Sequence, residues 1–137
     1  MWWIYALLSA LFASLTAIFS KMGVTAVNSN LATALRTVVI LVIAWAIVIA
    51  RGETKGLTSI SKHNLFFLII SGAATGLSWL FYFKALQLGK VSAVAPVDKL
   101  SVALTIVLSV IFLNEAISLK MAIGAAFIIA GTVILIW

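Results

Sequence analysis

Five long apolar segments dominate this sequence of 137 residues and limit what it can fold into. The hydrocarbon core of a bilayer is about 30 Å thick, and a helix needs about 17 to 25 mostly apolar residues to cross it. The segments that meet this requirement are Trp2–Phe19, Leu31–Ala50, Leu65–Phe83, Ser92–Leu113 and Met121–Trp137. Because a lipid-exposed backbone must satisfy its own hydrogen bonds, and these segments lack the alternating polarity of barrel strands, we expect five transmembrane helices. They form a single all-α membrane domain over residues 1–137.

The composition agrees with a chain that lies almost entirely in lipid. Of the residues, 65% are hydrophobic and 9% are charged, whereas soluble proteins carry about 25% charged residues. The formal charge is +6, from nine Lys/Arg against three Asp/Glu. Most of the basic residues lie singly in the short gaps between apolar segments, where membrane proteins keep their interfacial anchors. We therefore interpret the positive charge as membrane anchoring and expect no nucleic acid partner.

Several classes of chemistry lack the residues that they need. There is no cysteine for a disulfide or a thiolate metal site, and His63 has no cluster of carboxylates at ligand spacing. The sequence contains no phosphate-binding loop of the form G-x-x-x-x-G-K-[ST]. Its apolar segments also lack the paired Asp or the Ser/His arrangement of an intramembrane hydrolase. We expect a protein that is not an enzyme and that uses neither a cofactor nor a metal.

Five spans place the two termini on opposite sides of the membrane, and the basic residues give little bias between the two orientations. Those on the side of the N-terminus are Arg51, Lys55, Lys62 and Lys120. Those on the other side are Lys21, Lys84 and Lys90. Orientation follows an excess of Lys and Arg on the cytoplasmic side. Four against three is a weak excess, which favours a chain that inserts both ways up.

Small and hydroxylated residues recur at helical spacing in the apolar segments. The third segment has the stripe Ser71, Thr75, Ser78 and Tyr82, beside the G-x-x-x-G pair Gly72 and Gly76. The fourth has Asp98, Ser101, Thr105 and Ser109, and the first has Ser9, Ala13, Thr16 and Ser20. Such stripes either line a hydrated solute pathway or form packing seams between helices, and both interpretations stay open. Gly124 and Gly131 in the last segment indicate packing alone.

The charge pair Asp98-Lys99 follows Pro96, the one proline of the chain, and has two interpretations. If Pro96 is the first helical residue, Asp98 lies in the first turn and its charge complements the helix dipole, while Lys99 reaches the headgroups. Alternatively, Ala95 is pushed away from helical angles by the proline, the span is broken, and Asp98 lies in a solute or proton pathway. Lys99 would then oppose the effect of desolvation on the carboxyl group, because a nearby ammonium favours the charged form.

Two further basic residues lie in or beside apolar segments. Arg36 lies about six residues inside the second segment, so it either extends to the headgroups or serves the pathway. Lys84 follows the aromatic residues Trp79 and Tyr82. It is either an interface anchor or a cation in contact with these rings in a cavity.

The second half of the chain carries a recognisable series of short motifs. An aromatic-rich segment ends in Lys84-Ala-Leu, a G-x-x-S loop follows, and Val94-Ala-Pro opens the next span. Leu113-Asn-Glu then forms a short hairpin before a final helix of the pattern G-x-x-x-I-x-x-G. With this series the chain resembles the EamA domain of the drug/metabolite transporter superfamily. The first half agrees through "SALFASLTAIFSKMG" and "ATALRTVVIL".

The resemblance implies a secondary transporter of a small metabolite or drug-like solute that works by alternating access. Members of the superfamily usually carry two five-helix units as inverted repeats, ten helices in all, and this chain has one unit. It also has Asn114 where the hairpin commonly has glycine, which bears on the turn geometry. We expect an antiparallel homodimer in a bacterial or archaeal cell membrane, with a parallel dimer or a sister half-transporter as alternatives. The competing interpretation is a non-transporting membrane subunit or scaffold.

Overall fold

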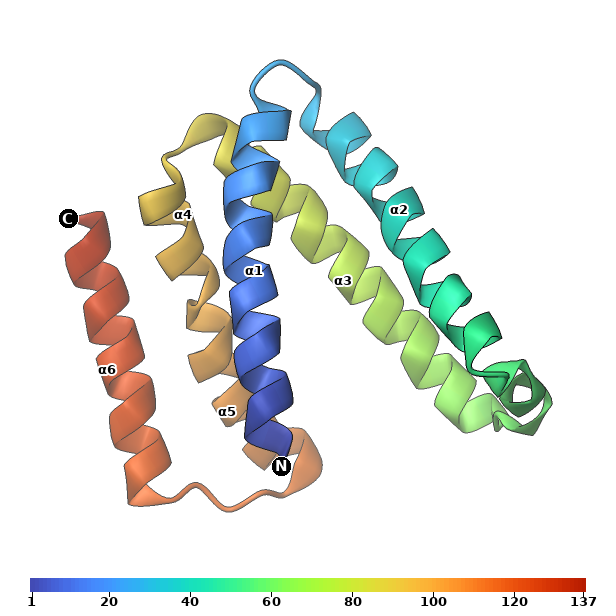
Figure 1. Ribbon diagram of the computed structural model, residues 1–137. Coiled ribbons are helices and arrows are strands. Elements are labelled where there is room, and N and C mark those ends of the chain that lie inside the picture. Colours follow the sequence, from blue (N-terminus) through green and yellow to red (C-terminus); the bar gives the residue numbers. More distant parts are fainter. The chain divides into compact units, whose positions relative to one another are not determined.

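Six α-helices and one 3-10 helix make up the chain in the computed structural model, which describes residues 1–137 (Figure 1). They are α1 (Trp2–Val24), α2 (Ser29–Ala50), η1 (Glu53–Ser59), α3 (Lys62–Leu88), α4 (Val91–Asp98), α5 (Leu100–Leu113) and α6 (Leu119–Ile136). Five helical spans are long and apolar enough to cross a membrane, with α4 and α5 together forming the fourth, Val91–Leu113. The predicted all-α membrane fold with five spans is therefore confirmed.

The helices extend past the apolar segments that predict them. α3 begins three residues before Leu65 and ends five residues after Phe83. The residues added at its start, Lys62 to Asn64, are polar, and those added at its end include Lys84 and Gln87 among apolar residues. Backbone hydrogen bonding continues there because it does not depend on apolar side chains. An apolar segment therefore marks the part of a helix in lipid, which is shorter than the helix.

Local polar residues fix several of the helix ends. The side chain of Asn28 caps α2 by accepting from the backbone N–H of Asn30 at 2.9 Å, and Ser118 caps α6 by accepting from Met121 at 3.2 Å. Both satisfy N–H groups that the first turn of a helix leaves without a partner. Gly52 after α2 and Asn114 after α5 adopt left-handed backbone angles, with φ of 68° and 53°. Such a residue ends a helix sharply.

The chain divides into two compact units, which we describe one at a time. One unit comprises residues 19–87 and contains the end of α1, α2, η1 and nearly all of α3. Its core lies near the 25–28 loop, where Val24, Phe83 and Leu86 are almost completely buried. Two hydrogen bonds fasten this end, from Lys21 Nζ to the carbonyl of Leu86 and from Gln87 Nε2 to the carbonyl of Val27 at 3.1 Å.

The other unit comprises residues 1–18 and 88–137. Within it, α6 contacts both α4 and α5, and Thr132 of α6 and Ala103 of α5 are buried. The N-terminus and the C-terminus lie at opposite ends of this unit (Figure 1). That arrangement agrees with an odd number of membrane crossings.

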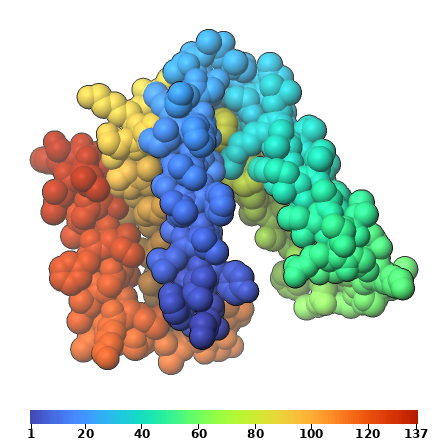
Figure 2. All heavy atoms as spheres, in the orientation of Figure 1, coloured from blue at the N-terminus to red at the C-terminus, as the bar shows by residue number.

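Most apolar side chains of the spans are exposed on the single chain. No more than 6% of the most apolar window of any span is buried. Figure 2 shows the row of side chains along α1, at the blue end of the colour scale. Large apolar residues of this helix such as Phe12 and Phe19 are 64% and 65% exposed. Surfaces of this kind need lipid or another protein chain to cover them.

Candidate functional site

The fourth span is interrupted after its first eight residues. α4 ends at Asp98, Lys99 forms a turn, and α5 begins at Leu100. Pro96 lies within α4 and has no N–H to donate to the carbonyl four residues earlier. The backbone bridges the interruption with tighter bonds of i→i+3 spacing, from Lys99 N to Pro96 O at 3.0 Å and from Val102 N to Lys99 O at 3.0 Å.

Thr132 of α6 holds this interruption in place. Its Oγ1 lies 3.2 Å from the carbonyl oxygen of Pro96 and 2.8 Å from that of Ile128 in its own helix. Thr132 is 4% exposed, so the contact is made away from solvent. The carbonyl of Pro96 therefore has a polar partner on the neighbouring helix. Sequence reasoning missed Thr132, because a threonine in an apolar helix usually bonds only to its own backbone.

Asp98 and Lys99 form an ion pair at the interruption. Lys99 Nζ lies 3.1 Å from Asp98 Oδ2, and the side chains of Lys99 and Asp98 are 56% and 36% exposed. The interpretation of Pro96 as the first helical residue is wrong, because α4 begins at Val91. The predicted break at Ala95 is also wrong in its position, because Ala95 is helical within α4 and the interruption falls at Lys99. Asp98 is thus the last residue of α4, and α5 has no side-chain cap. The carboxylate is not placed in the first turn that a dipole-capping role requires.

A second cluster joins α2 to α3 inside the other unit. The guanidinium carbon of Arg36 lies 4.3 Å from the centroid of the Trp79 ring and 5.3 Å from that of Phe83. Both distances are within the range of cation–π attraction. Arg36 and Trp79 are half-buried, and Phe83 is 2% exposed. The aromatic run predicted beside Lys84 therefore contacts Arg36 instead.

The remaining charged and aromatic candidates of this unit lie near the same end. Tyr82 is half-buried and close enough to Arg36 to interact with its charge. Lys84 is exposed, and its Nζ lies 3.4 Å from Gln87 Oε1. Sequence reasoning missed the partnership of Gln87 with Val27 and the burial of Phe83. The spacing of Phe83 four residues after Trp79 is the signal that places both on one helical face.

Threonine hydroxyls in the predicted stripes donate hydrogen bonds to backbone carbonyls of their own helices. Thr75 Oγ1 donates to the carbonyl of Ser71 at 2.9 Å, and Thr105 Oγ1 donates to that of Ser101 at 2.8 Å. All four of these residues are exposed on the single chain. Their oxygen atoms can accept further hydrogen bonds, and the pathway and the packing seam both stay predictions.

The glycines assigned to helix packing have no close neighbour. A Cβ atom added at Gly72, Gly76, Gly124 or Gly131 would meet no atom within 4 Å. No helix of the same chain therefore packs tightly against them. Their packing role stays a prediction, and it requires a second chain.

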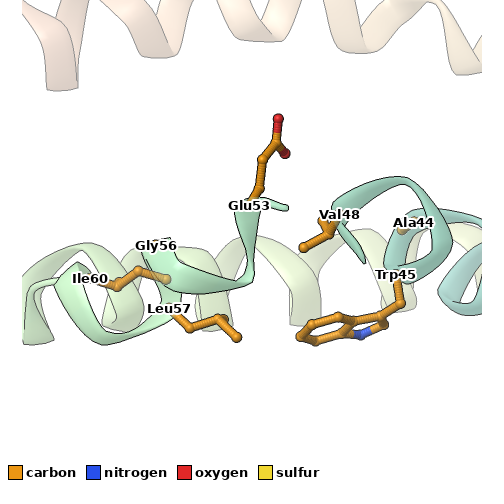
Figure 3. A pocket seen from close by; sticks show the side chains of 7 residues that line it. All are labelled: Ala44, Trp45, Val48, Glu53, Gly56, Leu57 and Ile60. Atoms are coloured by element: carbon orange, nitrogen blue, oxygen red, sulfur yellow. The ribbon is translucent and has the colours of Figure 1, made fainter. Parts of the chain in front are cut away.

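One open pocket lies at the opposite end of α2, against η1 (Figure 3). It has a volume of about 340 Å³ and is lined by Ala44, Trp45, Val48, Glu53, Gly56, Leu57 and Ile60. Trp45 and Leu57 flank its opening, and the carboxylate of Glu53 points away from it. Glu53 is paired with Arg51 at 3.6 Å. None of the predicted pathway residues lines this pocket.

Comparisons with known proteins extend over the whole chain. The model of the EamA-like transporter family matches residues 1–137. The "Uncharacterized transporter in cobO 3'region" of Sinorhizobium sp is 49% identical over 134 residues, which cover 98% of this chain and 95% of the relative. An uncharacterized protein of Methanocaldococcus jannaschii is 33% identical over 81 residues, 59% of each chain. No solved structure matches.

Proposed function

The chain belongs to the EamA-like transporter family, and we propose that it moves a small solute across a cell membrane by alternating access, as one half of a two-chain assembly. The observation that carries this proposal is the interruption of the fourth span at Asp98 and Lys99. Secondary transporters place solute and coupling-ion sites at such discontinuous helices, where backbone polar groups and charges become available inside the membrane.

The depth of the interruption supports a working site over an interfacial anchor. Asp98 comes seven residues after Val91, which is about 10 Å along the axis at 1.5 Å per residue. α5 continues for 14 residues beyond the turn. An ionised group this far into a span costs a few kcal/mol and is rarely present without a function. Pairing with Lys99 offsets part of that cost and leaves Asp98 able to exchange its partner for a proton or a cationic solute.

A second copy of the chain would complete the pathway. The relative from Sinorhizobium sp, which is named as a transporter, is matched over 95% of its length by one unit of this kind. The glycines and the exposed hydroxyl stripes give the single chain faces that another chain can cover. Because the number of spans is odd and the bias of basic residues is four against three, opposite insertion of two copies is the arrangement that we propose. The protein would then form antiparallel homodimers in the cell membrane of a bacterium or archaeon.

A labelling experiment tests whether the assembly encloses a water-filled pathway. The chain has no cysteine, so single cysteines at Ser71, Thr75, Ser101 and Thr105 can be labelled without background. We expect a membrane-impermeant, charged thiol reagent to modify them in intact membranes, because only hydrated thiols ionise and react. Cysteines at Phe81 and Phe127, each 74% exposed on the single chain, are the matched positions expected to face lipid and to stay unlabelled.

The same experiment separates a transporter from a scaffold. A dry seam between helices would leave all four stripe positions as unreactive as the two phenylalanine positions, and the transport proposal would then fail. If the stripes are labelled, radiolabelled metabolites and toxic cations supplied to cells with and without the chain identify the solute and the direction of transport.

A further inference from the structure

The unit of residues 19–87 contains a cation inside a span that has no acidic partner. Neither of the two ion pairs in the structure involves Arg36, since Arg51 pairs with Glu53 and Lys99 with Asp98. The contacts that the structure shows for Arg36 are with the rings of Trp79 and Phe83, and Tyr82 lies close enough to interact with its charge. Charged groups within a membrane are normally paired or functional. Contact with aromatic rings compensates the charge of Arg36 only in part.

The aromatic contacts leave the hydrogen-bonding edge of the guanidinium unused. The Arg36 Cζ lies 4.3 Å from the centroid of the Trp79 ring, and the five N–H donors of an arginine lie in the plane of its guanidinium. A planar fork of this kind matches a carboxylate or a phosphate with two parallel hydrogen bonds. The two ring contacts also limit the freedom of the Arg36 side chain, which reduces the entropy lost when an anion binds.

Arg36 lies on the buried side of α2 and not on the side that faces lipid. Ser29 and Thr33, seven and three residues earlier, are 4% and 5% exposed. Leu35, one residue before Arg36, and Val38, two residues after it, are 60% and 58% exposed. A side chain that reached the headgroups along the lipid surface would share the face of Leu35, so this placement argues against simple anchoring.

The other charged residues at this end of the unit are basic. Lys21 and Lys84 belong to the same end of this unit, by the last turns of α1 and α3. The one acid of the unit, Glu53, lies at its other end, beyond the C-terminus of α2. Three basic residues at this end of the unit favour the approach of anions from solution.

We propose that Arg36, held by Trp79 and Phe83, binds the carboxylate or phosphate group of a small organic anion. This assignment builds on the proposed transport function, since it names the chemical class of the solute. Its test measures binding alone.

The chain offers a direct test because Arg36 and Arg51 are its only arginines. An Arg51→Lys variant leaves Arg36 as the sole target of the arginine reagent phenylglyoxal, and modification is followed by mass spectrometry of the peptide that contains it. The probes are inorganic phosphate and succinate, with choline and glucose as cationic and neutral controls at matched ionic strength. At about ten times its dissociation constant an anion leaves about one site in eleven free, so labelling should slow about tenfold.

The reverse variant, Arg36→Lys with Arg51 retained, is the matched control. Arg51 has a side chain 71% exposed and already has a carboxylate partner, so phosphate and succinate should not protect it. Nanodiscs with and without anionic phospholipid separate a solute from a lipid headgroup. Protection by anionic lipid alone would assign the site to the headgroup and overturn the proposal of a soluble anion.

Two other results would also overturn the proposal. One is that choline or glucose protects Arg36 from phenylglyoxal as well as the anions do, and the other is that none of the probes protects it. An Arg36 that never reacts would show a guanidinium sealed from solutes and would end the proposal as well. Solute transport by a chain whose Arg36 is not protected by anions would remove this inference and leave the proposed function standing.

Discussion

The guanidinium carbon of Arg36 lies 4.3 Å from the ring centroid of Trp79, and this contact joins α2 to α3. A cation that sits over an indole ring in a partly desolvated place is attracted by the negative face of the ring. The contact therefore affects stability as well as any binding of anions, and the two effects can be measured separately.

We expect a double-mutant cycle of Arg36→Met and Trp79→Leu to give a coupling energy of about 1 kcal/mol. Reversible unfolding in mixed detergent micelles gives the free energies. Trp45 lies in α2 with no cation over its ring, so Trp45→Leu combined with Arg36→Met should be additive. Equal coupling in both cycles would mean that the loss of a large ring, and not the cation–π contact, accounts for the effect.

Thr132→Val tests the contact that holds the interruption of the fourth span. Valine has nearly the same shape and lacks the hydroxyl that donates to Pro96 O and Ile128 O. We expect a loss of about 0.6 to 1 kcal/mol in unfolding free energy, the range for hydrogen bonds between membrane helices. Thr105→Val removes a hydroxyl that bonds only within its own helix, so it should change stability less. An equal change for both would show that the bond to Pro96 contributes nothing.

Asn114 provides a test of backbone strain at the end of α5. Its φ of 53° and ψ of 32° are left-handed, a conformation that costs most residues about 1 to 2 kcal/mol and glycine almost nothing. Asn114, which stands where the hairpin commonly has glycine, therefore adopts the left-handed turn that glycine would adopt. Asn114→Gly should be neutral or stabilising, and Asn114→Ala should destabilise by about 1 kcal/mol. Thermal unfolding of the two variants side by side distinguishes them, and the opposite order would contradict the prediction.

The sequence was sufficient for the spans because the thickness of the bilayer requires runs of apolar residues that no soluble fold produces. It was insufficient for the start of α4, since Pro at the first turn and Pro within a helix give the same local pattern. The carbonyl of Pro96 also has a partner that the local sequence does not reveal, since Thr132 lies 36 residues later in the chain. The contact between Arg36 and Trp79 was missed for the same reason, because residues on different helices meet only through tertiary structure.

Orientation in the membrane should respond to single lysines if the chain inserts both ways up. Lys55 lies in η1 and Lys90 precedes α4, and the five-span topology predicts that they lie on opposite sides of the membrane. Each basic residue biases its own side toward the cytoplasm. Lys90→Gln should therefore increase the fraction of chains that insert with the N-terminus on the cytoplasmic side, and Lys55→Gln should decrease that fraction. Two C-terminal reporters, one active only inside cells and one only outside, measure the fraction.

A wild-type chain whose reporters read one side only, in all cells, would remove the antiparallel arrangement. A parallel dimer or a sister half-transporter would then have to supply the second unit. The exposed pair Arg51 and Glu53 offers a control, because Arg51→Lys keeps the charge and should leave the ratio of the two reporters unchanged.

Asp98→Asn tests the role of the carboxylate at the interruption of the fourth span. Asparagine keeps the size of the side chain and can still accept from Lys99, so the protein should reach the membrane at wild-type levels. It cannot release and rebind a proton, so energised accumulation of the solute found by screening should be lost. Exchange of labelled for unlabelled solute at equilibrium should persist, because exchange needs no net proton movement.

Glu115→Gln is the matched control for this prediction. Glu115 is exposed in the hairpin after α5 and lies outside the spans, so its neutralisation should leave accumulation intact. Wild-type accumulation by Asp98→Asn would show that the carboxylate only compensates the charge of Lys99. If Glu115→Gln alone loses solute accumulation, the proton-coupling residue lies in the hairpin and not in the interrupted helix. A group that exchanges protons with both sides of the membrane must lie where the pathway opens to each side in turn.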